Sequence, residues 1–165
     1  MKVQHSVVIR RPLPEVFAFV TDLRNESRWQ PEIESVVLDG PMGEGARFRE
    51  RRRSFGLSFD WRFRVTRYEP LRCVAIETLR SEQHWAPYRG ARYFEAVAGG
   101  TRVIEEGELE LPGVMRPFEP VFTRMSKRPL RVAYGRLATL LEGDDARRRA
   151  GATMRVAHCM LEPFG

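Results

Sequence analysis

Four titratable side chains of this sequence could take part in acid–base chemistry or anchor a polar ligand: Glu50, Arg52, His84 and Glu105. In a strand over residues 46–54, alternate side chains share a face, and counting from the apolar Phe48 turns Glu50 and Arg52 inward. A buried charge must be paired, so an inward Glu50–Arg52 pair would form a polar anchor for a ligand. The alternative is a bulge near residues 54–56 that turns both side chains to solvent.

The alternation of side chains allows two orientations of Glu105, depending on which neighbour is taken as buried. On a strand over residues 101–111, Glu105 shares a face with Val103, which would place it inside as a second polar candidate. Ile104 occupies the other face, and counting from it instead places Glu105 in water. The alternation leaves both orientations open.

Residues 81–89 separate two predicted strands, and this stretch contains His84, Trp85 and Tyr88. A loop of this length with aromatic side chains could cover the mouth of a binding site. His84 is the candidate histidine for acid–base work, because the pKa of an unperturbed imidazole lies near neutrality. The alternative is an ordinary surface histidine.

The sequence contains no recognised catalytic or metal-binding motif. No histidine stands at metal-ligand spacing from Cys, Asp or Glu, and no Ser-His-Asp or Cys-His nucleophile motif is present. The glycine-rich segment 40–45 lacks the lysine and the following helix that phosphate binding needs. We therefore predict no metal and no cofactor, and the motifs leave an enzymatic function undecided.

Charge and cysteine content exclude several classes of protein. The net charge is +6, but 26 of the 28 basic residues are Arg, spread among 22 acidic residues along the whole chain. This even distribution does not predict nucleic-acid binding. Cys73 and Cys159 have no ligand or redox spacing, and no apolar run approaches the roughly 20 residues of a membrane span. We expect a cytoplasmic protein that neither is secreted nor spans a membrane.

The N-terminal quarter of the sequence predicts one strand followed by two short helices. Residues 2–10 alternate between apolar and polar side chains, which is typical of a half-buried strand. An apolar stripe at helical spacing predicts a helix over about residues 13–20, with proline in its first turn. Asp22 is a good N-cap for a second helix over residues 23–29, which Pro31 ends.

The middle of the sequence has a period of two and predicts a meander of six antiparallel strands. These strands cover residues 33–39, 46–54, 57–67, 72–80, 90–97 and 101–111. The alternation is clearest over residues 57–65, where every odd-numbered side chain is apolar. With the first strand, the sheet has seven strands, with one face covered and the other in water.

Apolar residues at helical spacing predict a long helix of about 28 residues after Gly113, which covers the sheet. Pro129 should kink or break this helix near residues 127–129, because an interior proline removes one backbone hydrogen bond. Gly143 is the expected C-terminal cap. We therefore predict one domain over residues 1–142 and a tail over residues 143–165 of undetermined structure.

Large side chains on the sheet, the loop and the helix could line a ligand cavity. The candidates are Phe59, Trp61, Phe63, Trp85, Tyr93, Phe118, Phe122 and Met125. A mostly apolar cavity with a few polar groups is the usual form of a small-molecule site. The alternative is that these side chains form ordinary core.

Several motifs resemble those of one superfamily. They are Pro14-Glu15-Val16-Phe17-Ala18-Phe19-Val20-Thr21-Asp22, Arg28-Trp29-Gln30-Pro31, Tyr68-Glu69-Pro70, Phe94-Glu95 with Gly99-Gly100-Thr101-Arg102-Val103, and residues 137–142. Over residues 1–142 the sequence resembles the START-related (SRPBCC) superfamily, in particular its bacterial polyketide cyclase/dehydrase-like branch. The resemblance implies the α+β helix-grip fold, in which a curved seven-stranded antiparallel sheet wraps around a long C-terminal helix. It also implies a cavity between sheet and helix that often holds lipids, polyketides or other hydrophobic ligands, but no particular reaction.

Three functions are compatible with these observations. The leading hypothesis is binding of a small hydrophobic molecule, lipid-like or polyketide-like, between the sheet and the long helix. The second is a cofactor-independent polyketide cyclase or dehydratase, for which the sequence offers no motif that would assign catalytic residues. The third is an adaptor that binds a partner through the basic helix face and the tail. The oligomeric state is open, a homodimer included.

Overall fold

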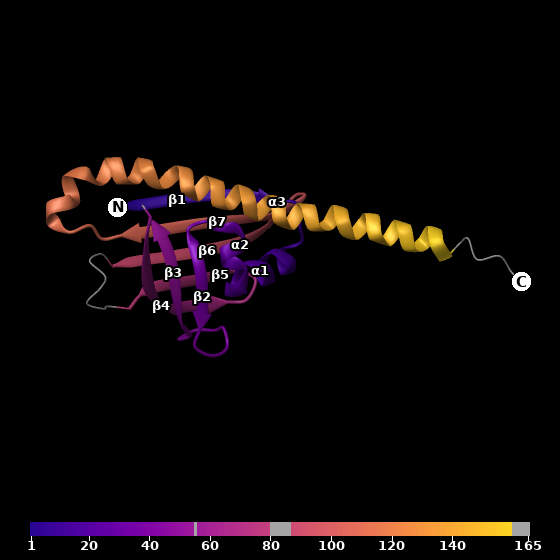
Figure 1. The fold of residues 1–165 in the computed structure, drawn as a ribbon, viewed down its shortest axis with the longest axis horizontal. Coiled ribbons are helices and arrows are strands. Elements are labelled where there is room, and N and C mark those ends of the chain that lie inside the picture. Colours follow the sequence, from indigo (N-terminus) through magenta and orange to yellow (C-terminus); the bar gives the residue numbers. More distant parts are fainter. Residues whose placement is uncertain (55, 80–86, 160–165) are drawn as a thin grey trace, which may run out of the picture.

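The computed structural model describes residues 1–54, 56–79 and 87–159, and within these ranges it describes side chains as far as residue 143, except that of Ser54. Seven strands form one antiparallel sheet in the order β1-β7-β6-β5-β4-β3-β2. They are β1 (Lys2–Ile9), β2 (Ile33–Leu38), β3 (Arg47–Ser54), β4 (Leu57–Glu69), β5 (Cys73–Thr78), β6 (Tyr88–Val97) and β7 (Gly100–Leu109). The sheet curves beneath one long helix (Figure 1), which confirms the predicted helix-grip architecture.

Strands β2 to β7 are joined in sequence order, and β1 pairs with β7, so that Val3 stands opposite Gly107. The predicted alternation holds on β1, β3, β6 and β7, where every second side chain turns toward the helix. Register shifts interrupt it on β2 near residues 33–35 and on β4 near residues 65–67. We call the covered side the inner face.

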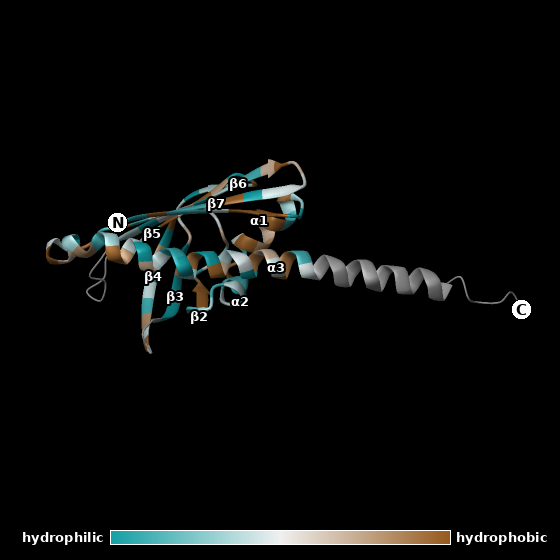
Figure 2. Ribbon diagram, turned by 90° about the horizontal axis from the view of Figure 1, so that it is seen from above, coloured by the Kyte–Doolittle hydropathy of each residue, from teal (hydrophilic) through white to brown (hydrophobic). Residues whose placement is uncertain are grey.

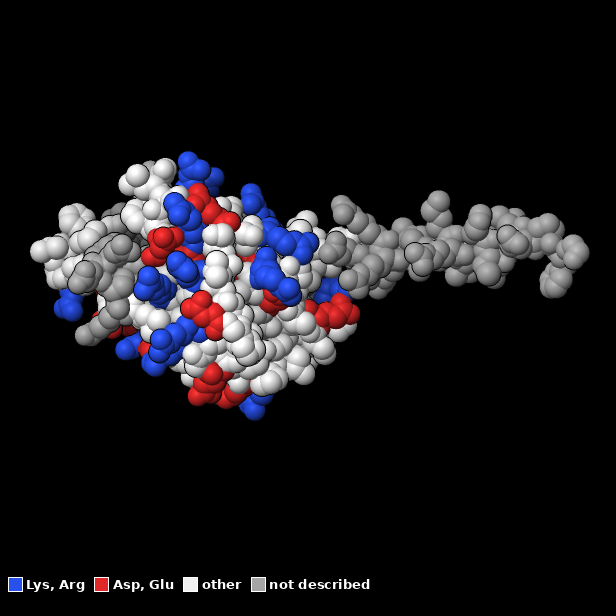
Figure 3. Space-filling view, turned by 60° about the horizontal axis from the view of Figure 1, so that its bottom comes forward, with Lys and Arg blue, Asp and Glu red and all other residues white. Residues whose placement is uncertain are grey.

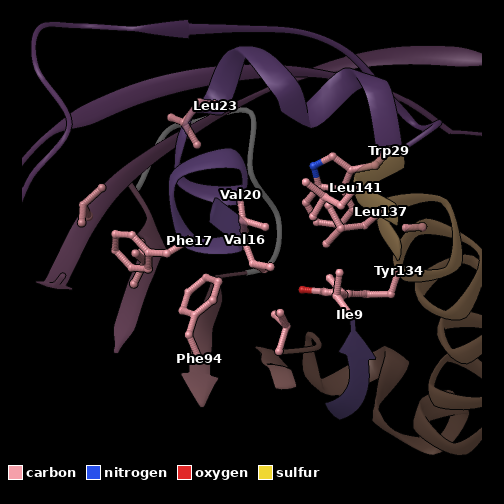
Figure 4. Packing of buried hydrophobic residues seen from close by; sticks show 14 of the residues in the cluster. Ile9, Val16, Phe17, Val20, Leu23, Trp29, Phe94, Tyr134, Leu137 and Leu141 are labelled. Carbon is pink, nitrogen blue, oxygen red and sulfur yellow. The ribbon is translucent and has the colours of Figure 1, made fainter. Parts of the chain in front are cut away.

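The two predicted short helices follow β1. Helix α1 spans Leu13–Thr21, and the second element divides into a 3-10 turn, η1 (Leu23–Asn25), and one turn of α-helix, α2 (Glu26–Trp29). The Asp22 carboxylate accepts a hydrogen bond from the Arg24 backbone N–H, as expected for an N-cap. These helices close one end of the sheet's inner face and contribute Trp29, Val16 and Val20 to the core (Figure 4).

The C-terminal helix differs from its prediction in two respects. A 3-10 helix, η2 (Gly113–Phe118), leads into α3, which runs from Glu119 to Cys159 without a break at Pro129. Proline leaves the Met125 carbonyl without its helical donor, but both residues are exposed, so water can hydrate that carbonyl. The predicted end at Gly143 is wrong: this residue does not adopt the left-handed conformation of a cap, and the helix continues past the sheet (Figure 1).

Helix α3 packs mainly on β1, and its buried residues lie in the stretch from Ala133 to Leu141. Tyr134, Leu137 and Leu141 meet Ile9 and Trp29 in one hydrophobic core (Figure 4). Seen from above, α3 crosses over the sheet (Figure 2). None of the helices in the described ranges is both long and apolar enough to cross a membrane.

Candidate functional site

Six polar side chains from five elements meet on the inner face beneath α3. We call them the inner charge cluster: Glu26 on α2, Glu50 and Arg52 on β3, Arg92 on β6, Glu105 on β7 and Tyr134 on α3. The strand members are there because each sits in phase with buried apolar neighbours, such as Phe48 and Phe94. Glu26, Glu50 and Tyr134 are each only 1% exposed.

Arg92 is the centre of the inner charge cluster. Its Nη1 donates to Glu26 Oε1 at 2.6 Å, and its Nε donates to Glu105 Oε2 at 2.7 Å. The Tyr134 hydroxyl donates to the same Glu105 oxygen at 2.6 Å. The guanidinium carbon lies 5.2 Å from the ring centre of Trp29, a cation–π contact. A planar guanidinium thus joins α2, β6, β7 and α3 in one hydrogen-bonded unit.

Glu50 and Arg52 form the second ion pair of the inner charge cluster. Arg52 Nε donates to Glu50 Oε2 at 2.7 Å. The carboxylate is buried, whereas the Arg52 side chain is 29% exposed, so Arg52 marks the edge of the cluster. Among the described residues, Nη1 and Nη2 of Arg52 have no hydrogen-bond acceptor. Two donor groups of a positively charged side chain are therefore free to bind an oxygen.

Glu26 is the acid of the inner charge cluster. Burial raises the pKa of Glu26 to about 8; attraction to Arg92 opposes this shift and repulsion by Glu50 adds to it. Glu26 Oε2 has no donor among the described residues, and Glu50 lies within hydrogen-bonding reach. A proton on Glu26 can be donated to Glu50, which gives both carboxyl groups a hydrogen bond. The cluster then contains two positive guanidiniums, Arg52 and Arg92, and two negative carboxylates, Glu50 and Glu105.

A row of aromatic side chains extends along the inner face, from the core to the solvent-exposed edge of the face. Phe48 stacks on Phe63 with ring centres 5.1 Å apart, and Trp61 stacks on Phe63 at 6.1 Å. Phe59, at the end of this row, is 48% exposed. Cross-strand pairing puts Arg52 directly opposite Phe59 and Glu50 opposite Trp61. The free donors of Arg52 therefore lie beside an accessible aromatic wall.

The core around Tyr134, Leu137 and Leu141 fills the space beneath residues 133–141 of α3. A void of about 10 Å³ lies beside Glu26 and Arg92, room for about one water molecule. The cluster and the core around Tyr134 occupy the region where the family's cavity was expected. A groove of about 800 Å³ lies instead on the surface between α1–η1 and β2.

The structure shows the orientation of the Glu50–Arg52 pair and of Glu105, both of which the sequence left open. Strand β3 pairs with β4 from Arg47 to Ser54 without a register shift, so no bulge there turns Glu50 and Arg52 outward. Glu105 lies in phase with Val103, and it is buried. All three polar candidates of the described strands thus face inward, while their role in binding or catalysis stays a prediction. His84 lies outside the described residues.

The apolar candidates separate into several groups. Phe59, Trp61 and Phe63 lie on the inner face, where Phe63 is core. Tyr93 lies on the opposite side of β6 from Arg92 and Phe94, so it faces away from the other candidates.

The helix candidates also differ from the expectation. Phe118 and Met125 are more than half exposed, and Phe122 is half-buried. Trp85 lies outside the described residues. Phe118 and Met125 are thus accessible to solvent, and the role of the helix candidates in ligand binding stays a prediction.

Sequence reasoning missed Glu26, Arg92 and Tyr134. Arg92 could have been found, because it lies two residues before the buried Phe94 on a strand. Tyr134 lies three residues before Leu137, within the apolar stripe of α3. Glu26 sits on a single helical turn, where no periodicity can be counted.

The family model described as "Polyketide cyclase / dehydrase and lipid transport" matches residues 1–142. No curated protein matches the sequence. The protein TTHA0849 of Thermus thermophilus has a similar structure, with a TM-score of 0.73 and 17% identity over 87% of this chain and 99% of that chain.

Two di-domain ARO/CYC proteins are also similar, BexL and StfQ of the BE-7585A and steffimycin biosynthetic pathways. Their TM-scores are 0.70 and 0.67, at 18% and 19% identity, over 86% and 88% of this chain and 50% and 46% of theirs. Likeness at such identities establishes a shared fold and carries no activity with it. The sequence match decides the family: the chain belongs to the polyketide cyclase/dehydrase and lipid transport family.

Proposed function

We propose that this protein binds a small apolar molecule that carries an acidic or carbonyl oxygen, at the edge of the inner face. The aromatic side chains of Phe59 and Trp61 would contact the apolar part, and the free guanidinium nitrogens of Arg52 would bind the oxygen. The observation that carries the proposal is the pairing of Arg52, whose Nη donors have no acceptor among the described residues, with the half-exposed Phe59. An apolar wall with one convergent polar group is the usual composition of a small-molecule site.

Family membership supports the same reading, since the family description names polyketide cyclases and lipid transport. Both groups of proteins handle mostly apolar molecules that contain oxygen. Glu50 supports the proposal too, because its hydrogen bond to Nε holds the Arg52 guanidinium in one orientation. A fixed donor loses less conformational entropy when a ligand binds.

The test compares two fluorescent probes of similar size, the anionic anilinonaphthalene sulfonate and the neutral N-phenylnaphthylamine. Arg52→Ala is expected to weaken binding of the anionic probe about 10-fold or more, because it removes a charged hydrogen bond, and the neutral probe much less. Trp61→Ala should weaken both. The matched control is Arg51→Ala, one residue away on the outer side of β3. Equal effects of the Arg51 and Arg52 variants would contradict the proposal.

A second candidate function, a cyclase or dehydratase that uses no cofactor, is favoured by the proton on Glu26. Glu26, Glu50 and Arg52 form a continuous polar chain from the buried acid to the accessible edge. Such a chain could exchange a proton with a ligand held at Arg52.

Proton exchange at the carbon between the carbonyls of a β-diketone probe, followed by NMR in deuterated water, tests this second function. The wild-type protein should accelerate the exchange above the buffer rate, and Glu50→Gln should lower the acceleration about 100-fold. Probe binding without any acceleration would exclude this function and leave the binding function standing.

A further inference from the structure

We propose that the outer side of α3 is a docking surface for a lipid bilayer that contains anionic lipids. The outer α3 surface is formed by Phe118, Val121, Arg124, Met125, Arg128 and Val132. It is distinct from the ligand site at Arg52, and its function does not depend on ligand binding.

The apolar part of the outer α3 surface faces away from the sheet. Val132 precedes the buried Tyr134 by two residues, which is a rotation of about 200° around a helix. Met125 lies seven residues before Val132, and Val121 lies four residues before Met125, so all three share one side. Their side chains are 43%, 52% and 55% exposed in that order. Three large apolar residues on one helix face thus have no partner within the described structure.

The charge of this helix segment has one sign. Residues 120–141 contain five Lys or Arg residues and no Asp or Glu. Arg124 and Arg128, which flank Met125, form no ion pair with any described residue. By contrast, basic and acidic side chains are interspersed on the face of the molecule shown in Figure 3. A partner that binds the outer α3 surface must therefore carry negative charge and must offer an apolar environment to the side chains of this surface.

An anionic bilayer meets both requirements. An interfacial helix inserts its apolar side chains at the boundary between headgroups and acyl chains, and its Arg side chains reach back to the phosphates. A second copy of the same surface would bring unpaired Arg side chains toward unpaired Arg side chains, which is unfavourable. Nucleic acid would pair with the charges, but it would leave Val121 and Met125 without apolar contacts.

Vesicle sedimentation with the full chain tests the proposal. The vesicles consist of phosphatidylcholine, either alone or with about 30% phosphatidylglycerol. Binding is expected with the anionic vesicles and not with phosphatidylcholine alone, and it should decrease as salt is added. The double variant Arg124→Ala/Arg128→Ala should bind about 25-fold more weakly, since each basic residue near the surface contributes about a factor of five. Val121→Ser/Met125→Ser should bind at least about 10-fold more weakly at unchanged charge.

The matched control is Arg49→Ala/Arg62→Ala, which removes the same charge from an exposed pair on the outer side of β3 and β4. This control should change vesicle binding less than about twofold. Circular dichroism checks that every variant is folded. The proposal is overturned if the chain binds no vesicles or if the control weakens binding as much as the α3 variants. A chain that self-associates without binding vesicles, and loses this self-association in Val121→Ser/Met125→Ser, would use the surface to bind a second copy, which also overturns the proposal.

Discussion

Replacing Arg92 by methionine is expected to destabilise the protein by about 3–5 kcal/mol. The guanidinium donates to Glu26 and to Glu105, and both carboxyls are almost fully buried. Methionine fills a similar volume but leaves the Glu105 carboxylate with the Tyr134 hydroxyl as its remaining hydrogen-bond donor in the described part of the chain. An uncompensated charge in the interior is among the few changes that cost this much. Urea unfolding followed by circular dichroism measures the difference.

The control for this experiment is Arg89→Met on the same strand. Arg89 is exposed on the outer side of β6, so the same change there should alter stability by less than about 1 kcal/mol. The double variant Arg92→Met/Glu105→Gln should recover part of the loss, because it removes the orphaned charge as well. If Arg92→Met costs no more than Arg89→Met, the ion pairs of the cluster do not hold the helix to the sheet.

The second large effect concerns pH. Because the pKa of Glu26 is raised to about 8 in the folded protein, against 4.5 ordinarily, folding takes up a proton between these values. The contribution of Glu26 to stability is thus complete below about pH 4.5 and lost as the pH rises through about 8. The loss from this group reaches several kcal/mol at most, and its slope corresponds to one proton per molecule.

Glu26→Gln should remove this loss. The amide keeps an oxygen for Arg92 Nη1, and its NH₂ group can donate toward Glu50 as the protonated acid does. The variant should match the wild type at about pH 5 and exceed its stability increasingly toward about pH 9. The measurement is urea unfolding at a series of pH values, with Glu106→Gln on the outer side of β7 as control. Parallel pH profiles for wild type and Glu26→Gln would show that Glu26 is ionised when folded.

The strands could be predicted from the sequence because the signal lies in neighbouring residues. In β4, every odd residue from Leu57 to Val65 is apolar. This alternation predicts a strand without any knowledge of the strands that pair with it. The orientation of Glu50 and Arg52 follows from the same counting once β3 is known to be free of a bulge. That last condition depends on pairing with β4, which a single segment does not reveal.

The composition of the inner charge cluster depends on tertiary structure, so local patterns do not reveal it. Glu26 and Arg92 are 66 residues apart and meet because α2 folds under α3. Two of the wall residues predicted on helix α3, Phe118 and Met125, are exposed for a related reason. The apolar residues of this helix belong to two opposite faces, with Leu137 toward the sheet and Met125 toward solvent, and both fit helical spacing. Periodicity alone does not say that only one face is covered.

The pairing of β1 with β7 has a consequence for biosynthesis. Val3 leaves the ribosome about 100 residues before Gly107, its neighbour in the sheet, and long before the helix that covers it. Until then the nascent chain carries an apolar strand with an unpaired edge, which favours aggregation. Chaperones that shield this strand until Gly107 has emerged should therefore raise the yield of folded protein.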